Sequence, residues 1–406
     1  MKKVLVLIQI FETPDDNGSD RHFYFCKKLV EEGYDVNVIT SNIDYKSAVP
    51  RFNDQNSAIK EIYGITVEYL KVYTNIRGSF MRRIFFYLSF FFQALYVLPK
   101  KKDIDIIYAV STPLSTGLLG SLASWFLQKP LTFEVTDVWP DAAIHTGVIK
   151  NRLLILVLKL IENFCYSRSD KIIALTEGIK RNIENKIQLS GKIELIPNGV
   201  DINLFEEISL QSRPNTRESY DFGSKIVCTY LGAHGSYNSL QTLIDAANYL
   251  KNYSKFIFLF IGDGDEKIRL IQLKEGLGLE NVKFLDPLPR KQAINLLNAS
   301  DLFLLPNRKG KFFEGNLPNK LFDFMMVGRP IIMSGRGESS KVIQESGCGI
   351  SVEPEDYIDM ANNIIKLGNM TEYERLKIGK KGSDFVRKNY NREEHSKLLE
   401  HIFANL

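Results

Sequence analysis

Short apolar segments alternate with amphipathic segments along most of the 406-residue chain. In the first 200 residues, a continuous apolar run predicts a buried strand at 4–10, and further strands are predicted at 35–40, 104–109, 131–135, 171–175 and 192–196. Such runs are typical of parallel strands that are covered on both faces. Segments with helical periodicity separate most of these runs. The alternation therefore predicts a parallel sheet with helices on both faces.

The same pattern stops and then begins again. Residues 206–224 are polar, so we expect a linker there. Further strands are predicted at 225–231, 256–262, 282–285, 301–306, 330–333 and 349–352. We predict an α/β protein of two doubly wound Rossmann-like domains, 1–203 and 204–385, that face each other across a cleft. A C-terminal helix of about 386–406 is expected to pack back onto the first domain. Ligands of such sheets bind at the carboxyl ends of the strands.

The composition is that of an ordinary globular protein, with 44% hydrophobic and 25% charged residues. A net charge of +4 is too near neutral for a dedicated nucleic-acid binder. The excess is unevenly placed, because residues 1–200 hold 25 basic and 21 acidic residues whereas the remainder hold 27 of each. Four Cys residues lie far apart without metal-ligand spacing, so we expect a reducing compartment and no metal site.

The stretch 313–330 carries the most specific chemical signal. It runs from a loop through a helix to a strand and places Lys320 near the start of the helix. Backbone N–H groups at a helix start favour an anion, and Lys320 adds a positive charge suited to a diphosphate. Asp323, one turn into the helix, is placed to accept hydrogen bonds from ribose hydroxyls. An ordinary capped amphipathic helix explains these residues equally well.

The motif Pro318-Asn319-Lys320-Leu321-Phe322-Asp323 resembles the nucleotide-sugar site of family-4 retaining glycosyltransferases, which have the GT-B fold. The motif of that family has two glutamates with seven residues between them. Asp323 matches the second, which binds ribose, whereas the first falls on Gly315 with Glu314 beside it. The resemblance implies that Lys320 and Glu314 act in catalysis.

Other segments resemble the same family along nearly the whole chain. The loop 230–240 is similar to the family's loop that approaches the diphosphate, and there His234 is either a phosphate donor or a simple surface residue. The segment 284–288 lies where relatives hold the base through backbone contacts. The resemblance assigns nucleotide-sugar contacts to Gly18, Ser19, Gly232, His234, Gly262, Leu285, Asn316, Leu317, Pro318, Asn319, Lys320 and Asp323.

The first half carries a motif of its own. Glu134-Val135-Thr136-Asp137-Val138-Trp139-Pro140-Asp141 resembles a segment of the bacterial lipopolysaccharide and capsule subgroup, near its L-fucosamine transferases. Asp137 follows a predicted strand end, and the resemblance implies a catalytic role in which it binds the acceptor hydroxyl. A capping or structural aspartate is an equally good explanation.

The resemblance implies a retaining, metal-independent glycosyltransferase that needs no cofactor. The implied donor is a UDP-sugar, such as a UDP-N-acetyl-deoxyhexose, and the implied acceptor is a polyprenyl-diphosphate-linked saccharide in O-antigen or capsule assembly. Two other functions stay open. One is a UDP-sugar epimerase of the same fold, and the other is a non-catalytic partner subunit that binds glycolipid.

Residues 84–98 are apolar almost all round and have basic flanks at Arg82, Arg83, Lys100, Lys101 and Lys102. A helix of that length is roughly 22 Å long, shorter than a hydrocarbon core of about 30 Å. We therefore expect residues 80–102 to lie in the interface of a membrane, with 153–161 as a second candidate. A helix buried against the sheet is the alternative. The expected location is cytoplasmic, bound peripherally to the inner face of the bacterial cytoplasmic membrane.

Overall fold

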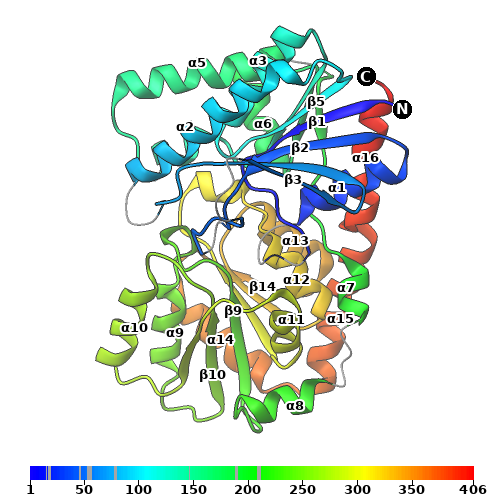
Figure 1. Cartoon of the computed structure of the whole chain (residues 1–406). Coiled ribbons are helices and arrows are strands. Elements are labelled where there is room, and N and C mark those ends of the chain that lie inside the picture. Colours follow the sequence, from blue (N-terminus) through cyan, green and yellow to red (C-terminus); the bar gives the residue numbers. More distant parts are fainter. Residues whose placement is uncertain are drawn as a thin grey trace. The chain divides into compact units, whose positions relative to one another are not determined.

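The computed structural model describes residues 1–14, 16, 20–44, 47–52, 57–76, 80–145, 147–187, 191–207 and 212–406. The chain forms two compact units, each with its own sheet (Figure 1). Unit 1 comprises Met1–Pro197 and Glu393–Leu406, and unit 2 comprises Asn198–Arg392. The division therefore falls between Pro197 and Asn198 rather than between residues 203 and 204.

Unit 1 is built on an eight-stranded sheet in the order β3-β4-β2-β1-β5-β6-β7-β8. The strands are β1 (Lys3–Leu7), β2 (Asp35–Ser41), β3 (Ser57–Ile62), β4 (Ile65–Leu70), β5 (Ile106–Val110), β6 (Leu131–Val135), β7 (Lys171–Ala174) and β8 (Ile193–Leu195). All neighbouring strands run parallel except β3, which is antiparallel to β4.

Helices cover both faces of this sheet. They are α1 (Arg21–Glu31), α2 (Phe80–Val97), η1 (Leu98–Lys100), α3 (Leu114–Leu127), α4 (Asp141–His145), α5 (Arg152–Arg168), α6 (Glu177–Lys186) and α16 (Arg392–Ala404). Val4 and Val6 of β1 share a core with side chains of α1 and α16. Leu5 and Leu7 point to the opposite face, where α2, α3 and α5 contribute to a second core. The alternation of one strand between two cores makes the sheet doubly wound.

The hairpin of β3 and β4 is absent from the sequence prediction. Its turn residues Tyr63 and Gly64 both have positive φ, 52° and 77°, as a two-residue hairpin turn of the favoured hand requires. On β3, Ala58 is buried whereas Ile59 is exposed, so the strand alternates between core and solvent. Alternation over so few residues is a weaker signal than the continuous apolar runs of the central strands.

Unit 2 has a six-stranded, wholly parallel sheet in the order β11-β10-β9-β12-β13-β14. The strands are β9 (Ile226–Leu231), β10 (Phe256–Ile261), β11 (Val282–Leu285), β12 (Leu302–Pro306), β13 (Ile331–Ser334) and β14 (Gly349–Val352). The helices are α7 (Ile202–Glu207), α8 (Ser212–Ser219), η2 (Ser236–Asn238), α9 (Gln241–Tyr249), α10 (Lys267–Gly276), α11 (Arg290–Asn298), η3 (Lys311–Gly315), α12 (Asn319–Val327), α13 (Glu338–Ser346), α14 (Tyr357–Gly368) and α15 (Glu372–Asn389). The predicted pair of doubly wound α/β domains is confirmed.

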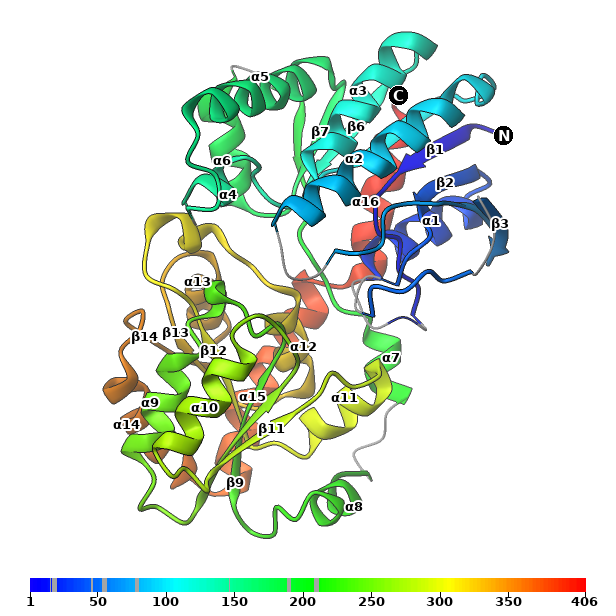
Figure 2. The same ribbon diagram turned by 60° about the vertical axis from the view of Figure 1, so that its left-hand side comes forward.

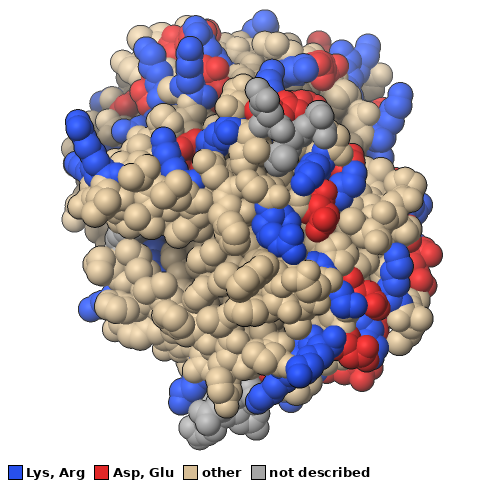
Figure 3. Space-filling model, turned by 90° about the horizontal axis from the view of Figure 1, so that it is seen from above, with Lys and Arg blue, Asp and Glu red and all other residues tan. Residues whose placement is uncertain are grey.

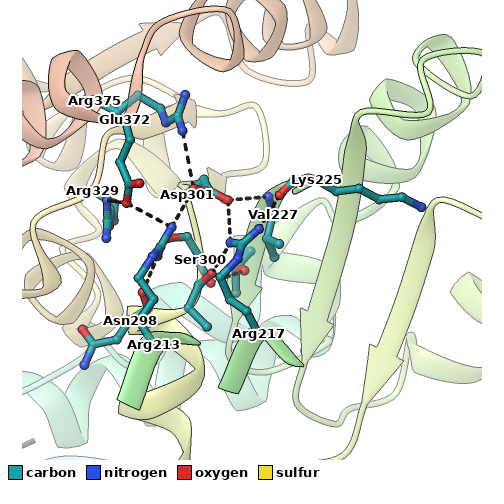
Figure 4. A network of polar contacts seen from close by, with 12 residues as sticks. Arg213, Arg217, Lys225, Val227, Asn298, Ser300, Asp301, Arg329, Glu372 and Arg375 are labelled. Carbon is teal, nitrogen blue, oxygen red and sulfur yellow. Dashed lines mark hydrogen bonds and ion pairs between the residues drawn. The ribbon is translucent and has the colours of Figure 1, made fainter. Parts of the chain in front are cut away.

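The prediction of a linker over 206–224 is wrong where α8 stands. This helix is polar, yet it is fixed by ion pairs to Asp301, the residue before β12 (Figure 4). The Asp301 carboxylate accepts hydrogen bonds from Arg213 Nη2 at 2.8 Å and from Arg217 Nη1 at 3.0 Å. It also accepts a hydrogen bond from the backbone N–H of Val227 at 2.9 Å. The same two arginines donate to carbonyls of the chain that precedes β9 and β12. Charge pairing thus orders a segment that has almost no apolar face.

Asp301→Asn is expected to lower the free energy of unfolding of unit 2 by about 3–5 kcal/mol, because it removes the negative charge from a buried cluster of arginines. Arg213, Arg217 and Arg375 all lie within 4 Å of that carboxylate, which is 3% exposed. Urea titration followed by fluorescence measures the change. Asp384→Asn, which breaks an exposed pair with Lys380, is the matched control and should change little. Equal effects of the two substitutions would contradict the role given to Asp301.

Candidate functional site

Two loops interlock at the carboxyl edge of the unit 2 sheet. The loop after β9 donates from Gly232 N–H to the Ile261 carbonyl at 2.9 Å and from His234 N–H to the Asp263 carbonyl at 2.8 Å. Gly262 has φ of 143°, and a Cβ there would lie 2.0 Å from the Gly232 carbonyl oxygen. The two backbones can approach this closely only because position 262 is glycine.

Lys320 lies beside this pair of loops. It stands in the first turn of α12, and a Cβ on Gly232 would lie only 2.8 Å from its Nζ. The Nζ donates to Tyr230 Oη at 2.8 Å and to Asn238 Oδ1 at 3.3 Å, and it lies 4.3 Å from the centre of the Tyr230 ring. Within the described part of the chain, no carboxylate forms an ion pair with Lys320. Burial lowers the pKa of Lys320 to about 7.

His234 is a buried residue, so the surface-residue alternative is wrong. Its side chain packs against Phe284 and Phe260 with edge contacts, and both ring nitrogens are buried without a hydrogen-bond partner. Burial, and then the charge of Lys267, lower the pKa of His234 to about 4. The imidazole is therefore neutral near pH 7 and adds no cation to the edge of the sheet.

Lys267, in the first turn of α10, is a residue that the sequence analysis missed. Its Nζ donates to the carbonyls of Gly262 at 2.9 Å and Leu285 at 3.4 Å, and it pairs with the exposed Asp286 at 2.6 Å. Gly262 N–H also donates to Leu285 at 3.1 Å. Lys267 thus ties together the ends of β10 and β11, the place at which the resemblance puts the base. No motif in the sequence marks it.

The segment that precedes α12 is held by its backbone. Gly337, with φ of 88°, lies so close that a Cβ would be 2.0 Å from the Glu314 carbonyl oxygen. Ser339 Oγ donates to the Asn316 carbonyl at 2.6 Å. Leu317 is buried in a core of unit 2, whereas Glu314 is half-buried and Asn316 is exposed. Pro318 occupies the N-cap position of α12, and Asn319 begins the helix.

Asp323 is already occupied by a protein partner. Arg290 Nη1 and Nη2 donate to its two carboxylate oxygens at 2.8 and 2.6 Å. No pattern in the sequence marks this pair, because Arg290 belongs to α11 and lies outside the motif around Lys320. The carboxylate to which the ribose role was assigned is therefore already hydrogen-bonded to Arg290 through both of its oxygens.

In unit 1, Asp137 lies just beyond the carboxyl end of β6, as expected from its position in the sequence. The side chain is exposed, and its one described hydrogen bond is a long contact of 3.5 Å with Thr112 Oγ1. Thr136 Oγ1 lies 2.8 Å from the same hydroxyl and donates to the Ser111 carbonyl. Gly18 and Ser19 lie outside the described residues.

Glu134 is the centre of a buried network behind Asp137. Its carboxylate is hydrogen-bonded to Arg21 Nε at 3.1 Å, to His22 Nε2 at 2.9 Å and to Tyr108 Oη at 2.5 Å. Burial alone would raise the pKa of Glu134, but Arg21 and His22 together with the hydrogen bonds lower it to about 2. Arg21 also donates to the carbonyl of Ile196, so the network joins α1 and β6 to the end of unit 1.

The structure thus gathers Gly232, His234, Gly262, Leu285 and Lys320 at one edge of the unit 2 sheet. A ring contact of 5.5 Å between Phe313 and Tyr237 brings the segment before α12 to the same edge. Asp137 belongs to the carboxyl edge of the other sheet. Among the described residues, no group of three or more His, Cys, Asp or Glu side chains is arranged to hold a metal ion.

The sequence segments that form the two sheets match models of known protein families. Residues 17–204 match the model described as Glycosyltransferase Family 4, and residues 225–369 match the model described as Glycosyl transferases group 1. In overall fold, the chain is similar to HepE of Anabaena, solved in complex with UDP and glucose, with a TM-score of 0.75 and 18% identity over 100% of both chains. We conclude that the chain is a glycosyltransferase with the GT-B fold.

Two curated relatives are informative. An uncharacterized glycosyltransferase of Methanocaldococcus jannaschii, MJ1069, is 24% identical over 415 residues and is covered completely, as is this chain. The Escherichia coli UDP-Gal:alpha-D-GlcNAc-diphosphoundecaprenol alpha-1,3-galactosyltransferase is 24% identical over 279 residues, which are 68% of this chain and 69% of the relative. The first shows that the similarity extends through both units.

Glu134→Gln should destabilise unit 1 by about 3 kcal/mol near pH 7, because the folded state lowers the pKa of Glu134 from its ordinary value of 4.5 to about 2. A lowered carboxyl pKa stabilises the fold above the ordinary value, and that stability is lost as the pH falls toward 2. The difference between wild type and variant should therefore shrink below about pH 4.5. Urea midpoints from pH 7 to pH 3 measure it. Glu194→Gln, which alters a half-exposed pair with Lys171, should show no such trend.

Proposed function

We propose that this glycosyltransferase moves a sugar from a UDP-sugar to a saccharide linked to polyprenyl diphosphate, with retention of the anomeric configuration and without a metal ion. The observation that carries the proposal is Lys320, a cation beside the Gly232 loop with no carboxylate partner among the described residues. A half-buried lysine without a carboxylate partner favours binding of an anion. The UDP complex of HepE and the lipid-diphosphate acceptor of the Escherichia coli relative support the two substrate classes.

Charge development on the leaving group sets what the site must do. As the acceptor oxygen bonds to the anomeric carbon, the bond between that carbon and the β-phosphate oxygen breaks and its electron pair leaves with UDP. The proton of the acceptor hydroxyl passes to the departing diphosphate. The anion favours the charged form of Lys320 and raises its pKa from about 7, so the lysine stabilises the departing diphosphate. We assign Asp137 to the acceptor hydroxyl, which loses its proton in this step, and Glu314 to the sugar of the donor.

Lys320→Met is expected to lower transfer by at least two orders of magnitude, because it removes the cation from the diphosphate. The assay incubates purified protein with a panel of nucleotide sugars and a polyprenyl-diphosphate disaccharide, and mass spectrometry detects the added sugar. Lys291→Met, at an exposed position on α11, is the matched control and should keep wild-type transfer. Near-normal transfer by Lys320→Met would remove the role assigned to this residue.

The same incubation separates the two alternative functions. An epimerase converts the sugar of the nucleotide donor when the acceptor is left out, and its product is seen in the nucleotide pool. A non-catalytic partner subunit binds UDP but yields no product with any donor and acceptor. Either result would overturn the proposal.

Membrane binding is the second part of the proposal, and α2 is its basis. One face of α2, with Phe86, Phe90, Ala94 and Leu98 of the following turn, is buried in unit 1. The opposite face is apolar as well and exposes Met81, Phe85, Leu88, Phe92 and Tyr96. These positions recur every three or four residues and so form one continuous stripe.

The helix is also longer than the sequence analysis expected. Among the described residues, Met81–Lys100 is the one helical stretch whose length and composition would let it cross a membrane, a test that a core helix of a soluble protein also passes. Because one side of α2 belongs to the core of unit 1, a position in the plane of the interface suits it better than a span. Of the basic flank, Lys101 is paired with Glu68 at 3.0 Å.

Helix α5 carries a second exposed apolar stripe, at Leu153, Leu156, Val157, Leu160 and Phe164. Helix α3 packs against both α2 and α5 and lies between them (Figure 2), and its end exposes Trp125 and Phe126. In the view from above in Figure 3, uncharged side chains cover a broad area, and both basic and acidic side chains lie around it. The exposed apolar stripes, together with the basic residues that flank α2, match the chemistry of an anionic membrane interface.

Replacing Phe85, Phe92 and Tyr96 by Ser is expected to lower the protein's partition onto vesicles of phosphatidylglycerol and phosphatidylethanolamine at least tenfold, since each aromatic ring contributes apolar area. Cosedimentation with the vesicles measures the bound fraction. The matched control replaces Ile59, Ile268 and Tyr373, which are similarly exposed on other elements, and should leave the bound fraction unchanged. Equal loss in both triple variants would argue against a membrane surface on α2.

A further inference from the structure

The pair of Arg290 and Asp323 bears on which nucleotides the donor site accepts. Arg290 is the first residue of α11, and its two terminal nitrogens face the two oxygens of Asp323 in a fork at 2.6 and 2.8 Å. Only 7% of the Asp323 side chain and 23% of the Arg290 side chain are exposed. The guanidinium also lies 5.7 Å from the ring of Phe205, which limits its movement on that side.

The pairing with Arg290 affects how Asp323 can bind a ribose, because of the geometry of a carboxylate. A carboxylate holds two neighbouring ribose hydroxyls by offering both oxygens along the edge on which their lone pairs converge. A guanidinium fork uses that same edge, with one N–H to each oxygen. The lone pairs that remain on Asp323 diverge, so they cannot accept from the 2′- and 3′-hydroxyls together. Because that edge is taken and only 7% of the Asp323 side chain is exposed, the 2′- and 3′-hydroxyls do not reach Asp323 while Arg290 is in place.

We infer that the donor site distinguishes little between ribonucleoside and 2′-deoxyribonucleoside diphosphates, so that its donors include sugars of both nucleotide classes. This inference rests on the proposed function and refines it. Affinity for the nucleotide then comes from Lys320 at the diphosphate and from the backbone around Gly232 and Leu285. Arg290 acts as a specificity-determining residue, because it occupies the edge of Asp323 that would otherwise select the diol.

The test compares UDP with 2′-deoxy-UDP, which differ in one hydroxyl, by isothermal titration calorimetry. Wild-type protein should bind the two with Kd values within about threefold of each other. Arg290→Met frees both oxygens of Asp323, so the preference for UDP should rise to about tenfold or more, the usual effect of a hydrogen bond to a charged group. Arg290→Lys, which keeps the charge but lacks the fork, should give an intermediate ratio.

The neighbouring Lys291→Met is the matched control and should keep the wild-type ratio. Circular dichroism and the affinity for UDP itself show whether each variant is folded. A wild-type preference for UDP of tenfold or more would overturn the inference, as would an unchanged ratio in both Arg290 variants. If wild-type protein binds neither nucleotide, the proposed donor site fails as well. Binding of UDP with strong rejection of the deoxy analogue overturns only the inference.

Discussion

The close approach of two backbones at the edge of the unit 2 sheet is the constraint on which the candidate site depends. A side chain at position 262 would place its Cβ 2.0 Å from the Gly232 carbonyl oxygen, and one at position 264 would meet the backbone of His234 at 2.6 Å. Because glycine allows both contacts, the loop after β9 lies flat on the loop after β10. Gly232 then comes within reach of Lys320, and His234 is driven into the core. Separation of the two loops would remove the setting of the cation.

Three buried acids of the two units have charged partners in the protein, whereas Lys320 has none among the described residues. Glu134, Asp301 and Asp323 are buried acids, and each is paired with arginine, whose guanidinium stays charged and offers several fixed donors. Lys320 differs, since its neighbours are a phenol and an amide rather than a carboxylate. A half-buried ammonium without a carboxylate partner costs free energy. An anionic ligand offsets that cost, so binding of the ligand is favoured.

The sequence predicted the parts of the fold that rest on local pattern. Continuous apolar runs located the central strands, and the restart of the pattern predicted two sheets. The β3–β4 hairpin and α8 were not predicted, because the first alternates over few residues and the second is held by the distant Asp301. The candidate site was also predicted only where a local motif marks it. The motif around Lys320 pointed to the loop edge, but Arg290, Lys267 and the basic partners of Glu134 stand on other elements, and their ion pairs join positions that lie 19 to 113 residues apart. Such pairs exist only once the chain has folded.

The uniform apolarity of α2 has a physical explanation that the sequence alone left ambiguous. A helix that merely covers a sheet needs one apolar face, and a helix in lipid needs apolar residues all round. In α2 the face with Phe90 and Ala94 belongs to the core of unit 1, while the face with Phe85 and Phe92 is exposed. The buried-helix alternative therefore explains one face of α2, and the exposed face is the basis of the proposed membrane contact. Exposure of such a stripe to water is unfavourable, and its transfer to a membrane interface lowers the free energy. One side of the helix therefore contributes to the core of unit 1, and the other side supports the proposed contact with the membrane.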